Sequence, residues 1–135
     1  MGVKLPKIYL DSCIAIYLVE EHPNYSPQIE SLVEGLSDAD ILVSDLTVME
    51  CLVGPLRKGD RSLEEKFNKW FDGVLVLPLS NIVFRDAGRL RADNSSLKTP
   101  DALHIATAVH HDCDEFWTND TRLDKVAPNM VRNIL

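Results

Sequence analysis

The sequence has little of what several classes of protein require. Six glycines without a repeating period exclude a collagen-like chain, and a hydrophobic content of 45% excludes an intrinsically disordered one. No apolar run approaches the roughly 18 residues that a transmembrane helix needs. The first residues also lack the apolar core, roughly 7–15 residues long, of a secretion signal. We therefore expect a globular protein of the cytoplasm with no part in the membrane.

Cysteine is scarce as well. Cys13, Cys51 and Cys113 are odd in number, far apart and set among apolar residues. This pattern is typical of reduced thiols in a cytoplasmic protein and argues against a disulfide framework. The nearest approach to zinc-ligand spacing is His-His-Asp-Cys-Asp at 110–114. Histidines near the end of a helix more often interact with the helix dipole, so we do not expect zinc there.

Basic residues are outnumbered, with 14 Lys and Arg against 21 Asp and Glu and a net charge of −7. Such a chain has no general attraction for nucleic acid, because phosphate contacts by Lys and Arg supply most of that affinity. Chemistry on nucleic acid would therefore need metal ions or a local basic rim. Two groups are candidates for a rim, although a solvated charged face explains each more simply: Arg85, Arg89 and Arg91, and Arg57, Lys58 and Arg61.

What the chain does contain is an alternation of short apolar runs with longer amphipathic segments. The runs predict strands at 8–10, 41–44, 74–77, 115–118 and 130–134. The periodic segments predict helices at 12–21, 26–36, 46–56, from 62 onward, 82–92 and 99–113. This order predicts an α/β fold: one domain over residues 1–135, with a central, mostly parallel sheet of four or five strands flanked by helices.

Three helix boundaries follow from local signals. The third helix should stop around Pro55 and Gly59. Ser62 should cap the fourth, since Glu65 follows three residues later. Thr99 should cap the sixth, with Pro100 at its first position.

Carboxylates stand where predicted strands end, and this is where parallel sheets place their working groups. Asp11 directly follows the first strand, and Asp120 comes two residues after the strand at 115–118. Asp101 lies in the first turn of its helix, and Glu50 lies in a helix that is apolar almost all round. Taken singly, each aspartate is also explained as a helix cap, a first-turn acid or a turn residue. A glutamate among apolar neighbours needs a partner.

Together, Asp11, Glu50, Asp101 and Asp120 form a candidate cation site. Gathered at one edge of the sheet, they would repel one another and raise one another's pKa unless a cation lay among them. An all-oxygen set suits Mg²⁺, which keeps several waters and takes one or two carboxylates plus substrate phosphate. Mn²⁺ shares this preference for oxygen.

Four segments of the chain resemble the motifs of one known family. They are Tyr9-Leu10-Asp11-Ser12, Thr47-Val48-Met49-Glu50, Pro100-Asp101-Ala102-Leu103-His104-Ile105-Ala106-Thr107-Ala108 and Trp117-Thr118-Asn119-Asp120. In this order and spacing they are similar to the motifs of PIN-domain ribonucleases, and most of all to those of the VapC toxins of type II toxin–antitoxin systems. The resemblance covers nearly the whole chain. Its most specific part is the helix at 101–108 followed by Thr-Asn-Asp.

The resemblance implies both an activity and a site. It makes Asp11, Glu50, Asp101 and Asp120 the catalytic, metal-binding quartet, with Ser12 and Thr118 as hydroxyls that orient a carboxylate or a water. It implies Mg²⁺- or Mn²⁺-dependent endonucleolytic cleavage of RNA, commonly tRNA or rRNA. It also implies a homodimeric toxin that a cognate antitoxin silences. Many relatives carry Asn where this chain has Cys13, so the role of that position is left open.

The chemistry of such a site is coherent. Metal ions held by the quartet would activate a water and stabilise charge in an in-line displacement, leaving a 5′-phosphate and a 3′-hydroxyl. A metal-independent ribonuclease would instead use a histidine base. His104, one helical turn from Asp101, could reach the site, although a packed helix histidine is the commoner case.

Other classes explain the sequence less well. A phosphatase of the haloacid dehalogenase type needs a second Asp at the position of Cys13, and a receiver domain needs an acidic pair that residues 4–10 lack. The alternative that stays open is a PIN-fold module that binds RNA or protein without cutting it. The acidity of the first 50 residues, Glu30 and Glu34 included, also suggests a docking face for a basic antitoxin segment; a solvated surface explains it equally well.

Overall fold

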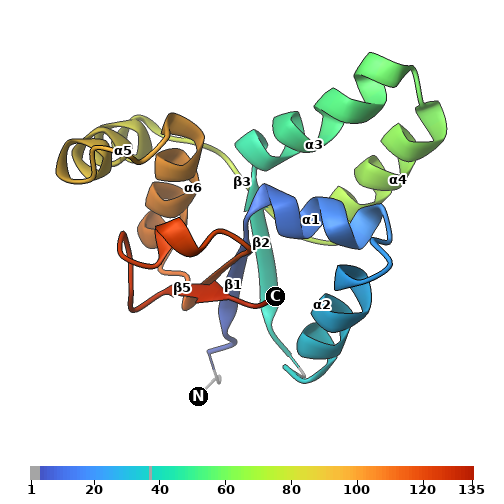
Figure 1. Cartoon of the computed structure of the whole chain (residues 1–135), viewed down its shortest axis with the longest axis horizontal. Helices are drawn as coiled ribbons and strands as arrows, with labels where there is room; N and C mark the ends of the chain where they lie inside the picture. Colours follow the sequence, from blue (N-terminus) through green and yellow to red (C-terminus); the bar gives the residue numbers. More distant parts are fainter. Residues whose placement is uncertain (1–3, 37) are drawn as a thin grey trace.

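The computed structural model describes residues 4–36 and 38–135, which form five strands and six α-helices (Figure 1). In chain order these are β1 (Lys7–Leu10), α1 (Ser12–Val19), α2 (Tyr25–Glu34), β2 (Asp40–Ser44), α3 (Asp45–Lys58), α4 (Arg61–Asp72), β3 (Leu75–Leu77), α5 (Asn81–Asp93), α6 (Thr99–His110), β4 (Glu115–Thr118), the short 3₁₀ helix η1 (Thr121–Leu123) and β5 (Val131–Asn133). The predicted α/β order is confirmed. Every helix in the described ranges is too short or too polar to span a bilayer.

The five strands form one parallel sheet in the order β3-β2-β1-β4-β5. The first three strands are added in one direction, after which the chain returns to the other side of β1 to add β4 and β5. The direction of winding therefore changes between β1 and β4. In open parallel sheets, the crevice beyond the carboxyl ends of the strands at such a switch point is where ligands bind.

Helices cover both faces of the sheet, as Figure 1 shows, with α5 and α6 on one side and α1 to α4 on the other. Alternate residues of β1 supply the two cores: Tyr9 packs on the side of α5 and α6, whereas Ile8 and Leu10 pack on the side of α1 to α4. Because both faces are buried, the inner positions of the central strands are apolar, which is why the strands could be predicted from short apolar runs.

Several predicted helix boundaries differ from the structure. The third helix, expected to stop around Pro55 and Gly59, runs through Pro55 to Lys58, and Gly59, whose φ of 66° is left-handed, is its cap. Gly54 precedes the proline, and without a Cβ it adopts the helical conformation that the proline ring would otherwise hinder. Asp60, and not Ser62, caps α4, because its carboxylate accepts a hydrogen bond from Leu63 N–H at 3.1 Å.

The sixth helix also differs from the prediction at both ends. Thr99 is its first residue and Lys98 stands at the cap position, without a side-chain capping bond. The helix ends at His110, three residues before the predicted end, and the chain then turns through Asp112 with a φ of 55°. The first helix is likewise shorter than predicted and ends at Val19, before Glu21 at a φ of 54°.

Two glycine substitutions should change stability in opposite directions. We expect Gly59→Ala to lower the free energy of unfolding by about 1 kcal/mol, because an alanine at a left-handed φ is strained. Gly88→Ala should raise it by about 0.5–1 kcal/mol, since Gly88 lies inside α5 and a Cβ there meets open space. Urea unfolding followed by circular dichroism measures both changes. A Gly59→Ala variant as stable as the wild type would contradict the left-handed conformation of Gly59 at the end of α3.

Candidate active site

A groove of about 570 Å³ opens beyond the carboxyl ends of β1 and β4, at the switch point of the sheet. All four predicted carboxylates line it, although they come from four different parts of the chain: Asp11, Glu50, Asp101 and Asp120. The predicted hydroxyl Ser12 also lines the groove. Thr118, the last residue of β4, is fully buried and reaches the site through Asp11.

Asp11 is held by hydrogen bonds to both of its carboxylate oxygens. Its Oδ1 accepts from the Ser12 backbone N–H at 2.8 Å, and its Oδ2 accepts from the Thr118 hydroxyl at 2.7 Å. The oxygen of Thr118 in turn accepts from the backbone N–H of Asp120 at 3.1 Å. Asp11 is therefore both the cap of α1 and part of the groove, and Thr118 connects the ends of β1 and β4.

Glu50 finds the partner that its apolar helix required. Its Oε1 accepts from the Ser12 hydroxyl at 2.7 Å and lies 2.5 Å from Nε2 of His104. Burial opposes ionisation of this carboxyl, but the hydrogen bonds with His104 and Ser12 outweigh it and hold the pKa of Glu50 below its ordinary value. Glu50 is therefore a carboxylate at neutral pH.

His104 connects Glu50 to the core of the protein. The ring is 1% exposed, and its Nδ1 lies 2.7 Å from the hydroxyl of Tyr9, which also hydrogen-bonds to the Ser44 hydroxyl at 2.8 Å. The expectation of a packed histidine was right, and the same residue also contacts the site. The contacts of Tyr9 had no signal in the sequence, because it stands in a buried strand like any core residue.

Asp101 and Asp120 differ in how their charge is compensated. Arg122 donates from Nε to Oδ1 of Asp120 at 2.9 Å and from Nη2 to Oδ2 at 2.7 Å, and these bonds lower the pKa of Asp120. Burial raises the pKa of Asp101, and the nearby charges of Asp11 and Asp120 raise it further. Like-charge repulsion in the groove therefore falls mainly on Asp101. The sequence analysis did not single out Arg122.

Cys13 lines the groove as a neutral thiol. Burial, followed by the charge of Asp11, raises its pKa to about 12. All three cysteines are free, in agreement with the prediction of reduced thiols. The two groups of basic residues predicted as rims do not line the groove. The basic residue that lines it is Arg122. Trp70 lines a separate apolar cavity and Phe71 is buried in the core.

The donor set fits a hard divalent cation. Within residues 4–36 and 38–135, no three His, Cys, Asp or Glu side chains are gathered closely enough to hold a metal ion as they stand, and this includes the segment 110–114. Mg²⁺ does not need such a cluster, because it keeps several waters and binds one or two carboxylates plus substrate phosphate. Four carboxylates around one open groove meet that requirement.

The unfavourable charge of Asp101 should be measurable as a change in the stability of the protein. In EDTA at pH 7, we expect Asp101→Asn to raise the midpoint of thermal unfolding by about 1–3 °C, because the amide removes a charge that burial, and after it Asp11 and Asp120, disfavour. A raised carboxyl pKa in the folded state means that stability is lost as pH rises through it. The gain should therefore shrink as pH falls toward about 4.

Asp86→Asn, at an exposed position inside α5, is the matched control and should change little. A lower midpoint for Asp101→Asn at pH 7 would show that the Asp101 carboxylate stabilises the fold.

The parallel sheet with carboxylates at its switch point defines an open α/β fold with an acidic groove at the carboxyl edge of the sheet. The family model described as "PIN domain" matches residues 8–128, so the chain belongs to the PIN domain family. It is 29% identical over 123 residues to Ribonuclease VapC13 of Mycobacterium tuberculosis, a match that covers 87% of this chain and 92% of that protein.

Two solved structures show the same fold. The VapBC2 complex of Rickettsia felis bound to a promoter DNA fragment aligns with a TM-score of 0.80 at 17% identity, covering 93% of this chain and 97% of that one. A toxin–antitoxin complex from Klebsiella pneumoniae aligns with a TM-score of 0.76 at 23% identity, with the same coverage of both chains.

Proposed function

We propose that this protein is a metal-dependent endoribonuclease and the toxin of a toxin–antitoxin pair. The observation that carries the proposal is the single groove that Asp11, Glu50, Asp101 and Asp120 line at the switch point of a PIN fold. The likeness to Ribonuclease VapC13 over most of both chains supports RNA as the substrate. The toxin–antitoxin complexes among the structural relatives support an antitoxin as the partner.

The four carboxylates are the residues that would hold Mg²⁺ or Mn²⁺. When bound, such an ion favours the hydroxide form of a water and neutralises charge on the phosphate. The chain's own residues keep the carboxylates ready: Thr118 orients Asp11, and Ser12 and His104 hold Glu50 in its ionised form. Ser12, Thr118 and His104 are therefore positioning residues, and the carboxylates are the catalytic ones.

The proposal extends to the organisation of the protein. Residues 1–135 make one PIN domain, since a single sheet carries both cores. The protein acts in the cytoplasm, where its RNA substrates are found, and as a homodimer. Ile82 and Phe84, more than half exposed near the start of α5, are apolar surface that a second copy could cover.

Cleavage of a mixed tRNA and rRNA panel tests the nuclease. With Mg²⁺ or Mn²⁺, we expect discrete products with 5′-phosphate ends, and in EDTA we expect no cleavage. Asp11→Asn should reduce the cleavage rate by about 100-fold or more, because the variant loses a buried metal-binding charge. Asp86→Asn should cleave like the wild type. Cleavage that survives both EDTA and Asp11→Asn would rule out this mechanism. RNA binding without cleavage, indifferent to metal, would favour the non-catalytic module.

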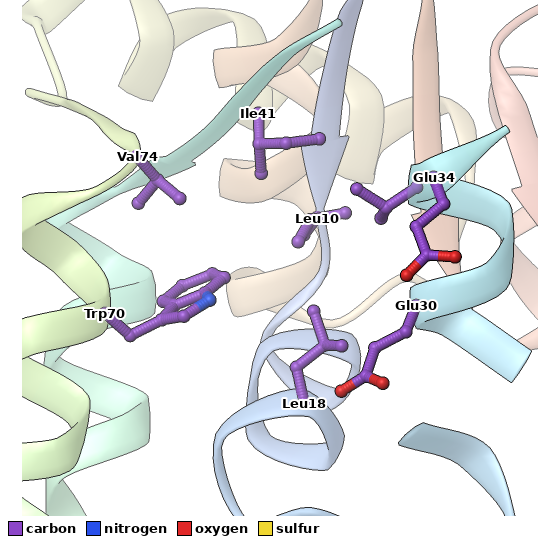
Figure 2. Close-up of a pocket in the computed structure, with 8 residues that line it drawn as sticks. Leu10, Leu18, Glu30, Glu34, Ile41, Trp70 and Val74 are labelled. Carbon is purple, nitrogen blue, oxygen red and sulfur yellow. The ribbon is translucent and has the colours of Figure 1, made fainter. Parts of the chain in front are cut away.

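A second cavity gives the antitoxin a candidate docking site. It has a volume of about 370 Å³ and lies apart from the four carboxylates. Figure 2 shows its apolar wall, to which Leu18 and Trp70 contribute, and the carboxylates of Glu30 and Glu34 on α2 at one side. A segment that carries an apolar side chain next to a basic one fits this combination. We propose that this surface is the acidic face, expected from the sequence, on which a basic segment of the antitoxin docks.

Charge reversal tests the docking site. We expect Glu30→Lys combined with Glu34→Lys to weaken the complex with the cognate antitoxin by about tenfold or more at low salt, mainly through slower association. Asp86→Lys combined with Asp93→Lys is the matched reversal on α5, across the sheet, and should leave the affinity unchanged. Surface plasmon resonance at two salt concentrations measures both. Equal affinities for the two double variants would exclude this surface.

A further inference from the structure

A smaller cavity of about 50 Å³ lies beside the carboxylate groove and shares part of its wall. Asp101, Asp120 and Arg122 line both spaces. The rest of the smaller cavity comes from the loop between α5 and α6, which contributes Lys98, and from the segment after η1, which contributes Lys125. Two loops that are distant in sequence thus meet next to the proposed site of cleavage.

Three cations face this cavity. Lys98, Arg122 and Lys125 are exposed and line it together with the two carboxylates, so the cavity carries a net positive charge of one. Arg122 uses Nε and Nη2 on Asp120, which fixes the plane of its guanidinium and leaves Nη1 to donate to another acceptor. The charge of Lys98 also reaches Asp120, whose pKa it helps to lower.

We propose that Lys98, Arg122 and Lys125 form a phosphate subsite that holds the RNA backbone beside the bond to be cut. This inference rests on the proposed ribonuclease function. The net positive charge of the cavity matches one phosphodiester group. A chain of net charge −7 needs such a local cation cluster, because phosphate contacts by Lys and Arg supply most of the affinity for nucleic acid.

The subsite replaces the rims that the sequence suggested. Arg85 lines a different cavity with Asn81 and Phe84, and Arg91 donates from Nε to the Leu97 carbonyl at 3.0 Å. Arg57 and Lys58 lie at the far end of α3, in its last turn, whereas Glu50 lies near its middle. The lysines at 98 and 125 are therefore better placed to contact an RNA strand that passes over Asp101 and Asp120.

The salt dependence of RNA binding tests the subsite without any cleavage. Binding of fluorescein-labelled tRNA and of a single-stranded rRNA fragment is measured by anisotropy in EDTA, from 50 to 300 mM KCl. We expect Lys98→Gln combined with Lys125→Gln to lower the affinity about 5- to 20-fold at 100 mM KCl. The slope of log K against log[KCl] should become shallower by about 1, because fewer counterions are released on binding.

Arg85→Gln combined with Arg89→Gln removes the same charge from α5 and is the matched control, expected to change the affinity less than twofold. Equal losses of RNA affinity in the two double variants would show that only the net charge of the protein matters, and would overturn the subsite. A wild type that binds neither RNA would overturn it as well.

The subsite and the nuclease fail in different ways. If the wild type cleaves RNA while the double lysine variant keeps wild-type affinity and slope, the subsite is wrong and the nuclease stands. If the lysines carry the salt dependence but no RNA is cut with Mg²⁺ or Mn²⁺, the subsite stands as part of an RNA-binding module and the nuclease is wrong.

Discussion

Four carboxylates line one groove at the edge of the sheet, and the contacts around the site compensate most of the charge that they bring together. Like-charge repulsion raises carboxyl pKa values, and a protonated carboxyl is a poor ligand for a cation. Three of the four carboxylates are compensated individually: Asp11 by Thr118 and the start of α1, Glu50 by Ser12 and His104, and Asp120 by Arg122. Asp101 is the exception: burial raises its pKa, and the charges of Asp11 and Asp120 raise it further.

These compensating contacts tie the site to the core. Tyr9 belongs to the central strand, packs against Phe116 with a ring-centroid distance of 5.4 Å, and hydrogen-bonds to both Ser44 and His104. His104 then reaches Glu50. A chain of buried polar groups therefore runs from β2 through β1 and α6 to α3. Because a buried polar group that loses its partner is costly, the fold and the charge state of the site are maintained by the same contacts.

Much of the fold and of the site could be predicted because the signals are local. The strands are buried on both faces and appear as apolar runs, and strand ends in a parallel sheet place Asp11 and Asp120 at one edge. Glu50 was singled out by the absence of a polar face around it. Asp101, after Thr99-Pro100, was also explained as a first-turn acid, and the resemblance to PIN-domain ribonucleases assigned it to the site.

The remaining features depend on which segments meet in space. The contact of His104 with Glu50 requires α6 to approach α3, and nothing in either segment states that distance. Arg122 looks like an ordinary surface charge until the turn after β4 brings it back onto Asp120. Helix ends were misjudged where two local signals competed, as at the start of α4, where Asp60 caps the helix in place of Ser62.

The distribution of charge agrees with the proposed function, in which an acidic protein binds both a polyanion and a basic partner. The apolar cavity with Glu30 and Glu34 lies among α1, α2 and α4, whereas the cavity with Lys98 and Lys125 lies on the side of α5 and α6 (Figure 1). The two cavities share no lining residue, so each surface can be altered by substitution without changing the wall of the other. Under the proposed function, the overall negative charge would disfavour RNA over most of the surface, and the cations beside the four carboxylates would be its point of contact.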